Sequence, residues 1–337
     1  MARRSCERWL GDQKMQVTRM AWIKATDIAY GRLRAPDLDV MEEFLTRFGM
    51  VRAERTNTAL YMRGTDPPHH IHVTEKGAPK FVGLAYYAAS EDDLERLARA
   101  PGASPIEDID EPGGGKRVRL TEPNGYQIEV VHGIARLPAI ATKRQKLNTG
   151  EDPLLRAGEL MRLPKGPSHV KRIGHGVLMT PKFRETVDWV RDMLGFVCSD
   201  DVYVGDKTNL IGSFNRCDRG DTYVDHHVFF CLNHAKTGLN HLSFEVPDID
   251  DVAVGHDYLA QFGTYEHMWG IGRHVLAAKS TITGPIHGAA CTSTGPTAIG
   301  SISPTVRTWC RRRRRSPRSG ARRRLKNSSI TPARETG

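Results

Sequence analysis

Two histidines, His175 in IGHGVL and His241 in GLNHLSFEVPD, each lie in the middle of an apolar run that predicts a buried strand. The second follows the first by 66 residues. A lone histidine in such a place is usually a hydrogen-bonded core residue. Imidazole is also a common metal ligand, and a site of the 2-His-1-carboxylate type needs two imidazoles and one acid around one ion. The pair therefore indicates a metal site, provided that a carboxylate completes it.

The chain repeats itself, and the repeat bears on these histidines. Residues 28–51, IAYGRLRAPDLDVMEEFLTRFGMV, match residues 173–197, IGHGVLMTPKFRETVDWVRDMLGFV, with one residue inserted. Each copy predicts a strand, a turn with proline, an amphipathic helix and a glycine that ends it. Further on, PPHHIHVTEKG is matched by DHHVFFCLNHAKTG, and VGLAYYAASEDDLERLA by TGLNHLSFEVPDIDDVA. The pattern predicts an α+β fold made of tandem β-α-β-β-β modules.

The two copies differ where the histidines stand. Aligned with His175 and His241, the first copy has Tyr30 and Tyr86, so we expect it to bind no metal. It keeps an acid, Glu129, in TEPNGYQIEVVHG at the end of its last predicted strand. By analogy a Glu is expected about 45 to 55 residues after His241, yet that part of the chain has no acidic residue.

Changes of composition mark the expected domains. Residues 135–167 are rich in proline and charge and have weak periodicity, which predicts a linker. The first domain is expected over 22–134, after an N-terminal extension of residues 1–21. The second is expected over 168–300, followed by a basic tail of residues 301–337 that we expect to be disordered.

The formal net charge of +10 is concentrated at one end of the chain. Residues 305–337 hold 12 Lys and Arg and a single acid, so the rest is nearly neutral. This run has no interleaved aromatic residues and no nucleic-acid-binding fold around it, so we expect no specific nucleic-acid partner. The six cysteines form no C-x-x-C pair, which favours reduced thiols and a cytoplasmic location. Since no run of 18 apolar residues occurs, we expect no membrane span.

Four motifs occur in order along the chain: IGHGVLMTPKFRETVDWVRDMLGF, DHHVFFCL, GLNHLSFEVPDIDDVA and WGIGRHVL. Together they resemble the type I extradiol ring-cleaving dioxygenases of the vicinal oxygen chelate superfamily. The resemblance implies that the tandem modules form two vicinal oxygen chelate domains, of which the second holds non-haem Fe(II) or, less often, Mn(II). It also implies that O2 cleaves a catechol-type aromatic ring next to its two hydroxyl groups.

The resemblance also implies roles for individual residues. His175 and His241 match the two imidazole ligands of the metal. His227 matches the acid/base histidine of the HH pair, and His274 in GRH matches a histidine that contacts the substrate. An acid/base role suits imidazole because it titrates near neutral pH. The first copy has an HH pair as well, so the pair alone does not mark a metal site.

The stretch after Leu276 departs from the family pattern. AAKSTITGPIHGAACTSTGP stands where the family has an aromatic, acidic strand pair that ends in the metal-binding Glu. Codons compatible with this stretch, read in a shifted frame, can spell GSKVYDYWTDPWGGMYEHWTDGD, whose DPWGGMYE aligns with EPNGYQIE of the first copy. We interpret the chain as frameshifted from about residue 277. The missing Glu is expected near Ser293 and a substrate-positioning Tyr near Thr283; the alternative is a divergent tail.

Three functions stay open at this point. The first is an extradiol dioxygenase whose partners are a small aromatic diol and O2, and for which we expect a homo-oligomer. The second is another metal enzyme of the same superfamily, such as a glyoxalase-like isomerase. The third is an inactive remnant, because the chain with its sequence as printed, called the literal chain below, lacks the Glu ligand.

Overall fold

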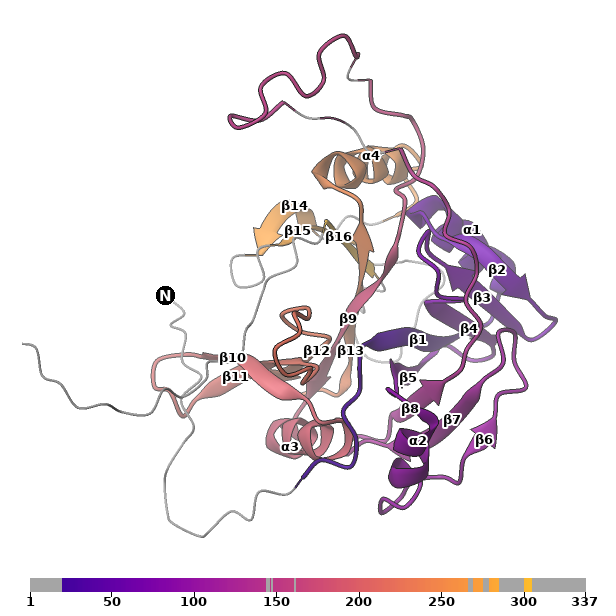
Figure 1. Ribbon diagram of the computed structural model, residues 1–337, viewed down its shortest axis with the longest axis vertical. Coiled ribbons are helices and arrows are strands. Elements are labelled where there is room, and N and C mark those ends of the chain that lie inside the picture. Colours follow the sequence, from indigo (N-terminus) through magenta and orange to yellow (C-terminus); the bar gives the residue numbers. More distant parts are fainter. Residues whose placement is uncertain are drawn as a thin grey trace, which may run out of the picture.

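The computed structural model describes residues 20–143, 146, 148–160, 162–265, 269–274, 279–284 and 300–304. These residues form two domains, each built on one eight-stranded sheet (Figure 1). The first domain has strands β1 (Ile28–Ala35), β2 (Val51–Arg55), β3 (Ala59–Arg63), β4 (His72–Lys76), β5 (Lys80–Tyr87), β6 (Glu107–Asp108), β7 (Lys116–Thr121) and β8 (Gln127–His132), with helices α1 (Leu38–Phe48) and α2 (Glu91–Leu97). The second has strands β9 (Arg172–Thr180), β10 (Val197–Tyr203), β11 (Leu210–Arg216), β12 (Phe229–Asn233), β13 (Gly238–Val246), β14 (Trp269–His274), β15 (Lys279–Gly284) and β16 (Gly300–Pro304), with helices α3 (Phe183–Leu194) and α4 (Ile249–Ala260).

Both sheets have the same strand order. It is β2-β3-β4-β1-β5-β8-β7-β6 in the first and β10-β11-β12-β9-β13-β16-β15-β14 in the second. Each domain contains two β-α-β-β-β modules, and the first strands of its two modules pair antiparallel at the centre of the sheet, β1 with β5 and β9 with β13. The predicted α+β class and the internal repeat are confirmed.

Local signals in the sequence set the limits of the first helix of each domain. Asp37 caps α1, since its Oδ1 accepts hydrogen bonds from the backbone N–H groups of Asp39 and Val40 at 2.8 and 3.1 Å. The helices α1 and α3 end at Gly49 and Gly195, whose φ angles of 114° and 70° favour glycine. These glycines are the helix ends that the repeat predicts.

The two domains contact each other through related pairs of residues. A Cβ atom added at Gly31 on β1 would lie 2.4 Å from Leu242 Cδ1, and one added at Gly176 on β9 would lie 2.8 Å from Leu84 Cδ1. Each central strand therefore approaches a leucine of the other domain at a residue without a side chain. Because the contacts are reciprocal, Leu84 of the first sheet corresponds to Leu242 of the second.

The segment that precedes each domain binds the other domain. Ala25 N–H donates to Leu194 O at 2.9 Å, at the end of α3. Val170 N–H donates to Gly49 O at 3.1 Å, just after α1. One cluster of buried apolar side chains extends through both domains. This shared core fixes the orientation of β1 relative to β9.

The described part of the chain also bears on the predicted boundaries. Strand β16 lies in the second sheet, so the second domain extends to residue 304, beyond the limit predicted at 300. The basic run of the predicted tail lies outside the described residues.

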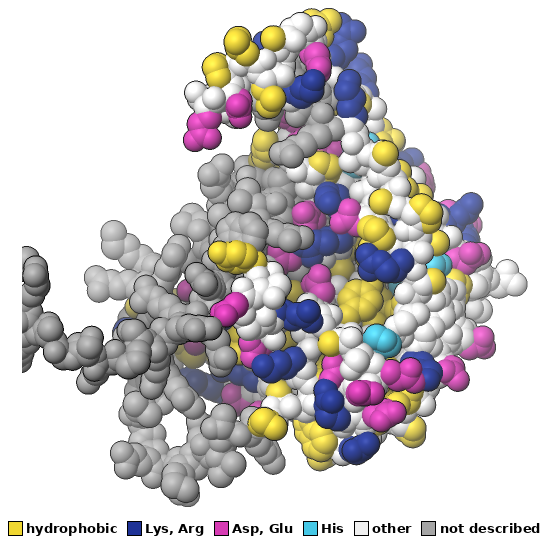
Figure 2. All heavy atoms as spheres, viewed as in Figure 1, with side chains coloured by type: hydrophobic (Ala, Val, Ile, Leu, Met, Phe, Trp, Pro, Cys, Tyr) yellow, Lys and Arg dark blue, Asp and Glu magenta, His cyan; other side chains and the backbone are white. Residues whose placement is uncertain are grey.

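No helix within the described ranges is both long and apolar enough to cross a bilayer. On the face shown in Figure 2, basic and acidic side chains are interspersed over the described surface.

Candidate metal centre

His175 and His241 lie on the two central strands of the second sheet. In the antiparallel pairing of β9 with β13, His175 stands opposite Ser243 and His241 opposite Val177. The Nε2 atoms of the two histidines are 3.3 Å apart, and His175 is 6% exposed. The structure therefore brings together the two ligands that the sequence predicts, although 66 residues separate them.

The geometry of this pair fits a shared metal ion. With each nitrogen about 2.1 Å from an ion, a separation of 3.3 Å corresponds to an N–metal–N angle of roughly 100°. The Nδ1 atom of His241 lies 2.7 Å from Asn240 Oδ1, which can only accept a hydrogen bond. His241 therefore carries its proton on Nδ1 and keeps the Nε2 lone pair for a metal, as the outer hydrogen bond of a histidine ligand does.

A carboxylate would be needed as the third ligand of the candidate site. Among the described residues, no group of three or more His, Cys, Asp or Glu is arranged to hold a metal. The position near Ser293, where a Glu is expected, lies outside them. In the structure β16 pairs parallel with β13, placing Ser301 opposite Ser243, just as β8 places Glu129 opposite Ala85. Ser301 thus has the register position that an acid occupies in the first sheet.

His227 lies beside the two candidate metal ligands. Its ring centroid lies 4.2 Å from that of His175, and the side chain is buried at 3% exposure. Phe214 packs against the same ring with a centroid distance of 4.8 Å. A buried imidazole in contact with a candidate metal ligand is suitably placed to exchange a proton with a group bound there.

His274 and Thr283 are placed by their backbones alone. His274 is the last residue of β14, and Thr283 lies on the neighbouring strand β15, opposite Trp269. The described structure thus gathers three of the four predicted site residues, and the side-chain position of the fourth stays a prediction.

The corresponding place in the first domain holds an ion-pair network. Tyr30, which corresponds to His175, donates its hydroxyl hydrogen to Glu129 Oε2 at 2.5 Å. Burial and the adjacent Glu129 charge raise the pKa of Tyr30 well above its usual range. Arg32 Nη2 lies 3.2 Å from the same carboxylate oxygen, and Arg117 Nη1 lies 3.5 Å from the other. Guanidinium groups therefore offset the Glu129 charge.

The alignment of Tyr86 with His241 is wrong by three residues. In the first sheet Arg32 pairs with Gly83, and in the second the corresponding Val177 pairs with His241. Gly83 therefore corresponds to His241, in agreement with the reciprocal leucine contacts. A Cβ atom at Gly83 would lie 1.6 Å from Gln127 O on β8. The backbone therefore leaves no room for a histidine side chain at the position that corresponds to His241.

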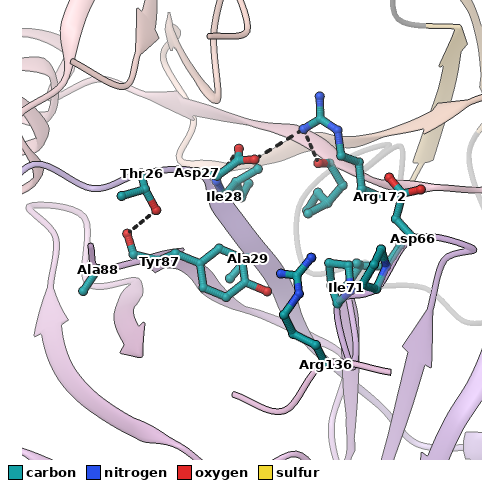
Figure 3. A pocket seen from close by; sticks show the side chains of 13 residues that line it. Thr26, Asp27, Ile28, Ala29, Asp66, Ile71, Tyr87, Ala88, Arg136 and Arg172 are labelled. Carbon is teal, nitrogen blue, oxygen red and sulfur yellow. Dashed lines mark hydrogen bonds and ion pairs between the residues drawn. The ribbon is translucent and has the colours of Figure 1, made fainter. Parts of the chain in front are cut away.

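Three carboxylates surround Arg172 at the start of β9. The guanidinium contacts Asp225 Oδ2 at 2.5 Å and Glu245 Oε2 at 2.6 Å. It also reaches towards the first domain, where Asp27 Oδ2 lies 3.6 Å away (Figure 3). Burial would lower the pKa of Arg172, but the carboxylates outweigh that effect and raise it. Since Asp225 directly precedes the HH pair, Arg172 ties that segment to β9.

Asp27 and Arg172 line a cavity of about 400 Å³ between the domains, together with Tyr87 and Arg136 (Figure 3). Burial raises the pKa of Asp27 to about 6 against the opposing effect of Arg172. Asp27 and Arg172 occupy corresponding positions, since each stands three residues before Tyr30 or His175. The pair therefore joins the starts of the two central strands.

Sequence reasoning missed two contacts of the site. Asp200 on β10 lies 2.8 Å, Oδ2 to Nε2, from His226, the first histidine of the HH pair. Arg172 was missed as the partner of Asp225, although the motif DHH showed an acid beside the pair. Asp200 gave no signal of this kind, because it lies on β10, 26 residues before His226 in the chain.

Comparison with known proteins finds relatives of the chain. No protein-family model matches the sequence. Over 249 residues the chain is 27% identical to metapyrocatechase 2 of Cupriavidus necator, and the match covers 73% of each chain. The chain is a relative of the extradiol ring-cleaving dioxygenases. The resemblance found in the sequence motifs is confirmed.

Solved structures related to these dioxygenases share the fold of the chain. Homoprotocatechuate 2,3-dioxygenase from Brevibacterium fuscum, in complex with 3,4-dihydroxyphenylacetate, is 16% identical with a TM-score of 0.65, covering 86% of this chain and 84% of that one. The Mn(II)-bound glyoxalase from Novosphingobium aromaticivorans is 22% identical with a TM-score of 0.64, covering 83% and 82%. These similarities confirm the vicinal oxygen chelate fold, which extradiol dioxygenases and glyoxalases share.

Proposed function

We propose that the chain is an extradiol dioxygenase that cleaves a catechol-type aromatic ring with O2 at a divalent metal, Fe(II) or Mn(II). The observation that carries the proposal is the meeting of three histidines at the centre of the second sheet. His175 and His241 bring their Nε2 atoms to 3.3 Å, and the His227 ring lies 4.2 Å from that of His175. The similarity to metapyrocatechase 2 supports the same reaction.

His175, His241 and His227 have roles that follow from their surroundings, and the family resemblance supplies the role of His274. His175 and His241 would hold the ion through their Nε2 atoms. When bound, the ion supplies the Lewis acidity that favours ionised diol oxygens and the redox chemistry that O2 requires. His227, buried beside His175, takes up a proton from a substrate hydroxyl and returns it to the reacting substrate in a later step. His274 would contact the substrate from β14.

Two other functions compete with this one. A glyoxalase-like activity is compatible with the fold, because a Mn(II)-bound glyoxalase is among the similar structures. The HH pair and the sequence similarity to a ring-cleaving relative favour the dioxygenase. An inactive remnant is the third possibility, since the described residues supply two neutral ligands and no acid.

The decisive experiment restores the family sequence. Residues 277–299 are replaced by GSKVYDYWTDPWGGMYEHWTDGD, which supplies the Glu and Tyr that the frameshift interpretation predicts. We expect the restored protein, loaded anaerobically with Fe(II), to consume O2 with a catechol and form the yellow ring-opened product. The matched control carries Gln in place of the single Glu of the new segment, and neither it nor the literal chain should react.

The result also separates the rival functions. A restored protein that takes up Fe(II) but consumes no O2 with any of a panel of catechols contradicts the proposal. Isomerisation of the thiol adduct of an α-ketoaldehyde by that protein supports the glyoxalase-like function instead. Turnover by the literal chain at the restored rate contradicts the frameshift interpretation.

We also propose a homo-oligomer in the cytoplasm, with no specific nucleic-acid or membrane partner. Among the described residues, the buried free thiols of Cys217 and Cys231 support a reducing compartment. Size-exclusion chromatography with light scattering tests the oligomeric state, and a monomer at micromolar concentration contradicts it.

A further inference from the structure

A carboxylate holds the histidine that precedes His227. Asp200 Oδ2 on β10 lies 2.8 Å from His226 Nε2, and the imidazole is buried at 3% exposure. An ionised carboxylate can only accept hydrogen bonds, so Nε2 of His226 carries the hydrogen and donates it. In a neutral imidazole the other nitrogen, Nδ1, then has a lone pair and accepts.

That acceptor lies against His227. The Nδ1 atoms of His226 and His227 are 3.2 Å apart, so the His227 Nδ1–H group donates to His226. The hydrogen of a neutral His227 is thereby fixed on Nδ1, and its Nε2 becomes the basic nitrogen. We propose that Asp200 and His226 are positioning residues that set the tautomer of His227. The use of His227 in proton transfer rests on the proposed function, whereas its tautomer does not.

The backbone at Asp200 is shaped for this contact. The pairing of β10 with β11 shifts between Cys198 and Asp200, which leaves Ser199 in a bulge. Ser199 Oγ donates to the backbone oxygen of His226 at 2.5 Å. Arg216 Nη1 in turn contacts Ser199 Oγ at 3.1 Å and Cys198 O at 2.8 Å. Two neighbouring residues thus hold the backbone and the ring of His226.

The first domain provides a comparison within the same chain. Its HH pair, His69 and His70, has the same Nδ1 contact at 3.1 Å. Strand β2 has the same shift in pairing, between Arg52 and Glu54, so Glu54 corresponds to Asp200. Among the hydrogen bonds of the described residues, Glu54 makes none to His69. The edge-to-face histidine pair therefore belongs to the fold, and the carboxylate contact belongs to the domain with the candidate metal ligands.

Histidine NMR of the metal-free full chain tests the proposal without any turnover. Long-range proton–nitrogen correlations of the 15N-labelled rings show which nitrogen carries the hydrogen. We expect His226 with hydrogen on Nε2 and His227 with hydrogen on Nδ1. Asp200→Ala should abolish the Nδ1–H form of His227, while Asp200→Asn, whose side-chain oxygen still accepts, should retain it. Glu54→Ala is the matched control and should leave both rings unchanged.

The outcomes are independent of the dioxygenase assay. Hydrogen on Nε2 of His227 in the unaltered chain overturns the proposal, and this reading needs no variant to fold. An Asp200→Ala protein that is folded by circular dichroism and keeps the Nδ1–H form of His227 overturns it as well. If the tautomers are as predicted but the restored protein cleaves no catechol, this inference stands and the proposed function alone is contradicted.

Discussion

Gly83 occupies in the first sheet the position that His241 occupies in the second. Both residues stand opposite corresponding residues of the central strand, Arg32 and Val177. Both also precede the N-cap of the next helix by the same number of residues, with Ser90 before α2 and Asp248 before α4. The first domain thus has the same fold and one acid, while its backbone excludes a side chain at the position of His241.

This relationship predicts where the chain binds metal. In the full chain, replacing both His175 and His241 with Ala should abolish binding of Mn(II) or Fe(II), since the first domain offers no substitute. Tyr30→Phe, at the position that corresponds to His175, should leave binding unchanged. Isothermal titration and elemental analysis measure the stoichiometry, and retained stoichiometric metal in the double variant would contradict the prediction.

Glu111 is predicted to stabilise the first domain above acid pH. Its carboxylate pairs with Arg32 at 2.9 Å and Arg117 at 2.7 Å. Burial by itself would raise the pKa of Glu111, but the two guanidinium groups outweigh it and lower the pKa from 4.5 to about 2. Because the folded-state pKa is depressed, the stabilisation is present above pH 4.5 and is lost as the pH falls through 2.

The variant Glu111→Gln should lower the free energy of unfolding at pH 7 by on the order of 3 kcal/mol. The difference from the parent protein should shrink as the pH falls below 4.5. Urea unfolding at several pH values measures this, with the exposed Glu151→Gln as control. An equal destabilisation at every pH would mean that charge pairing is not the cause.

Asp27 is predicted to act in the opposite direction at the domain interface. Burial raises its pKa from 3.8 to about 6, so the folded protein favours the protonated acid. Its contribution to stability is therefore full below pH 3.8 and declines as the pH rises through 6. Nearly half of the side chain is exposed, at 45%, so the effect should be modest.

The variant Asp27→Asn tests this by removing the titration while keeping an oxygen for the Ile28 N–H group, which Asp27 Oδ1 binds at 2.8 Å. We expect the variant to gain stability relative to the parent as the pH rises from 4 to above 6. Thermal unfolding across this pH range gives the comparison. A variant that loses stability relative to the parent over the same range would show that the Arg172 pair outweighs burial.

Much of the fold could be predicted because local signals carry it. The glycines at 49 and 195, the periodic helices and the repeat predict the modules, and the repeat brings His175 and His241 to matching strands. The register of β5 could not be predicted in this way. Gly83 and Gly238 each precede a leucine, and this local likeness suggests an alignment that the pairing with the central strands excludes.

The environment of the site was harder to predict from sequence than its ligands. Arg172 gathers Asp27, Asp225 and Glu245 from three segments far apart in the chain. Such contacts depend on how strands are stacked side by side, and they follow no period along the chain. The HH pair was visible in the sequence, but only the structure shows that Asp200 binds its first member.

The final prediction concerns the missing acid of the literal chain. Ser301 on β16 stands opposite Ser243, as Glu129 stands opposite Ala85, so an acid at position 301 would have the register of the acid in the first sheet. Two neutral imidazoles leave the charge of a divalent ion uncompensated. Changes outside the ligand set alone typically alter affinity by ~10 to 100-fold, and an added anionic ligand should exceed this.

We therefore expect Ser301→Glu to raise the affinity of the full chain for Mn(II) by more than ~10-fold. The control is Ser303→Glu, which adds the same charge two residues, or about 7 Å, along the strand. Titration with Mn(II), followed by electron paramagnetic resonance, measures both. Equal gains from the two variants would show that added charge, and not the register of β16, produces the effect. A gain from Ser301→Glu that disappears with His241→Ala would show that the new acid shares its ion with the histidine of β13.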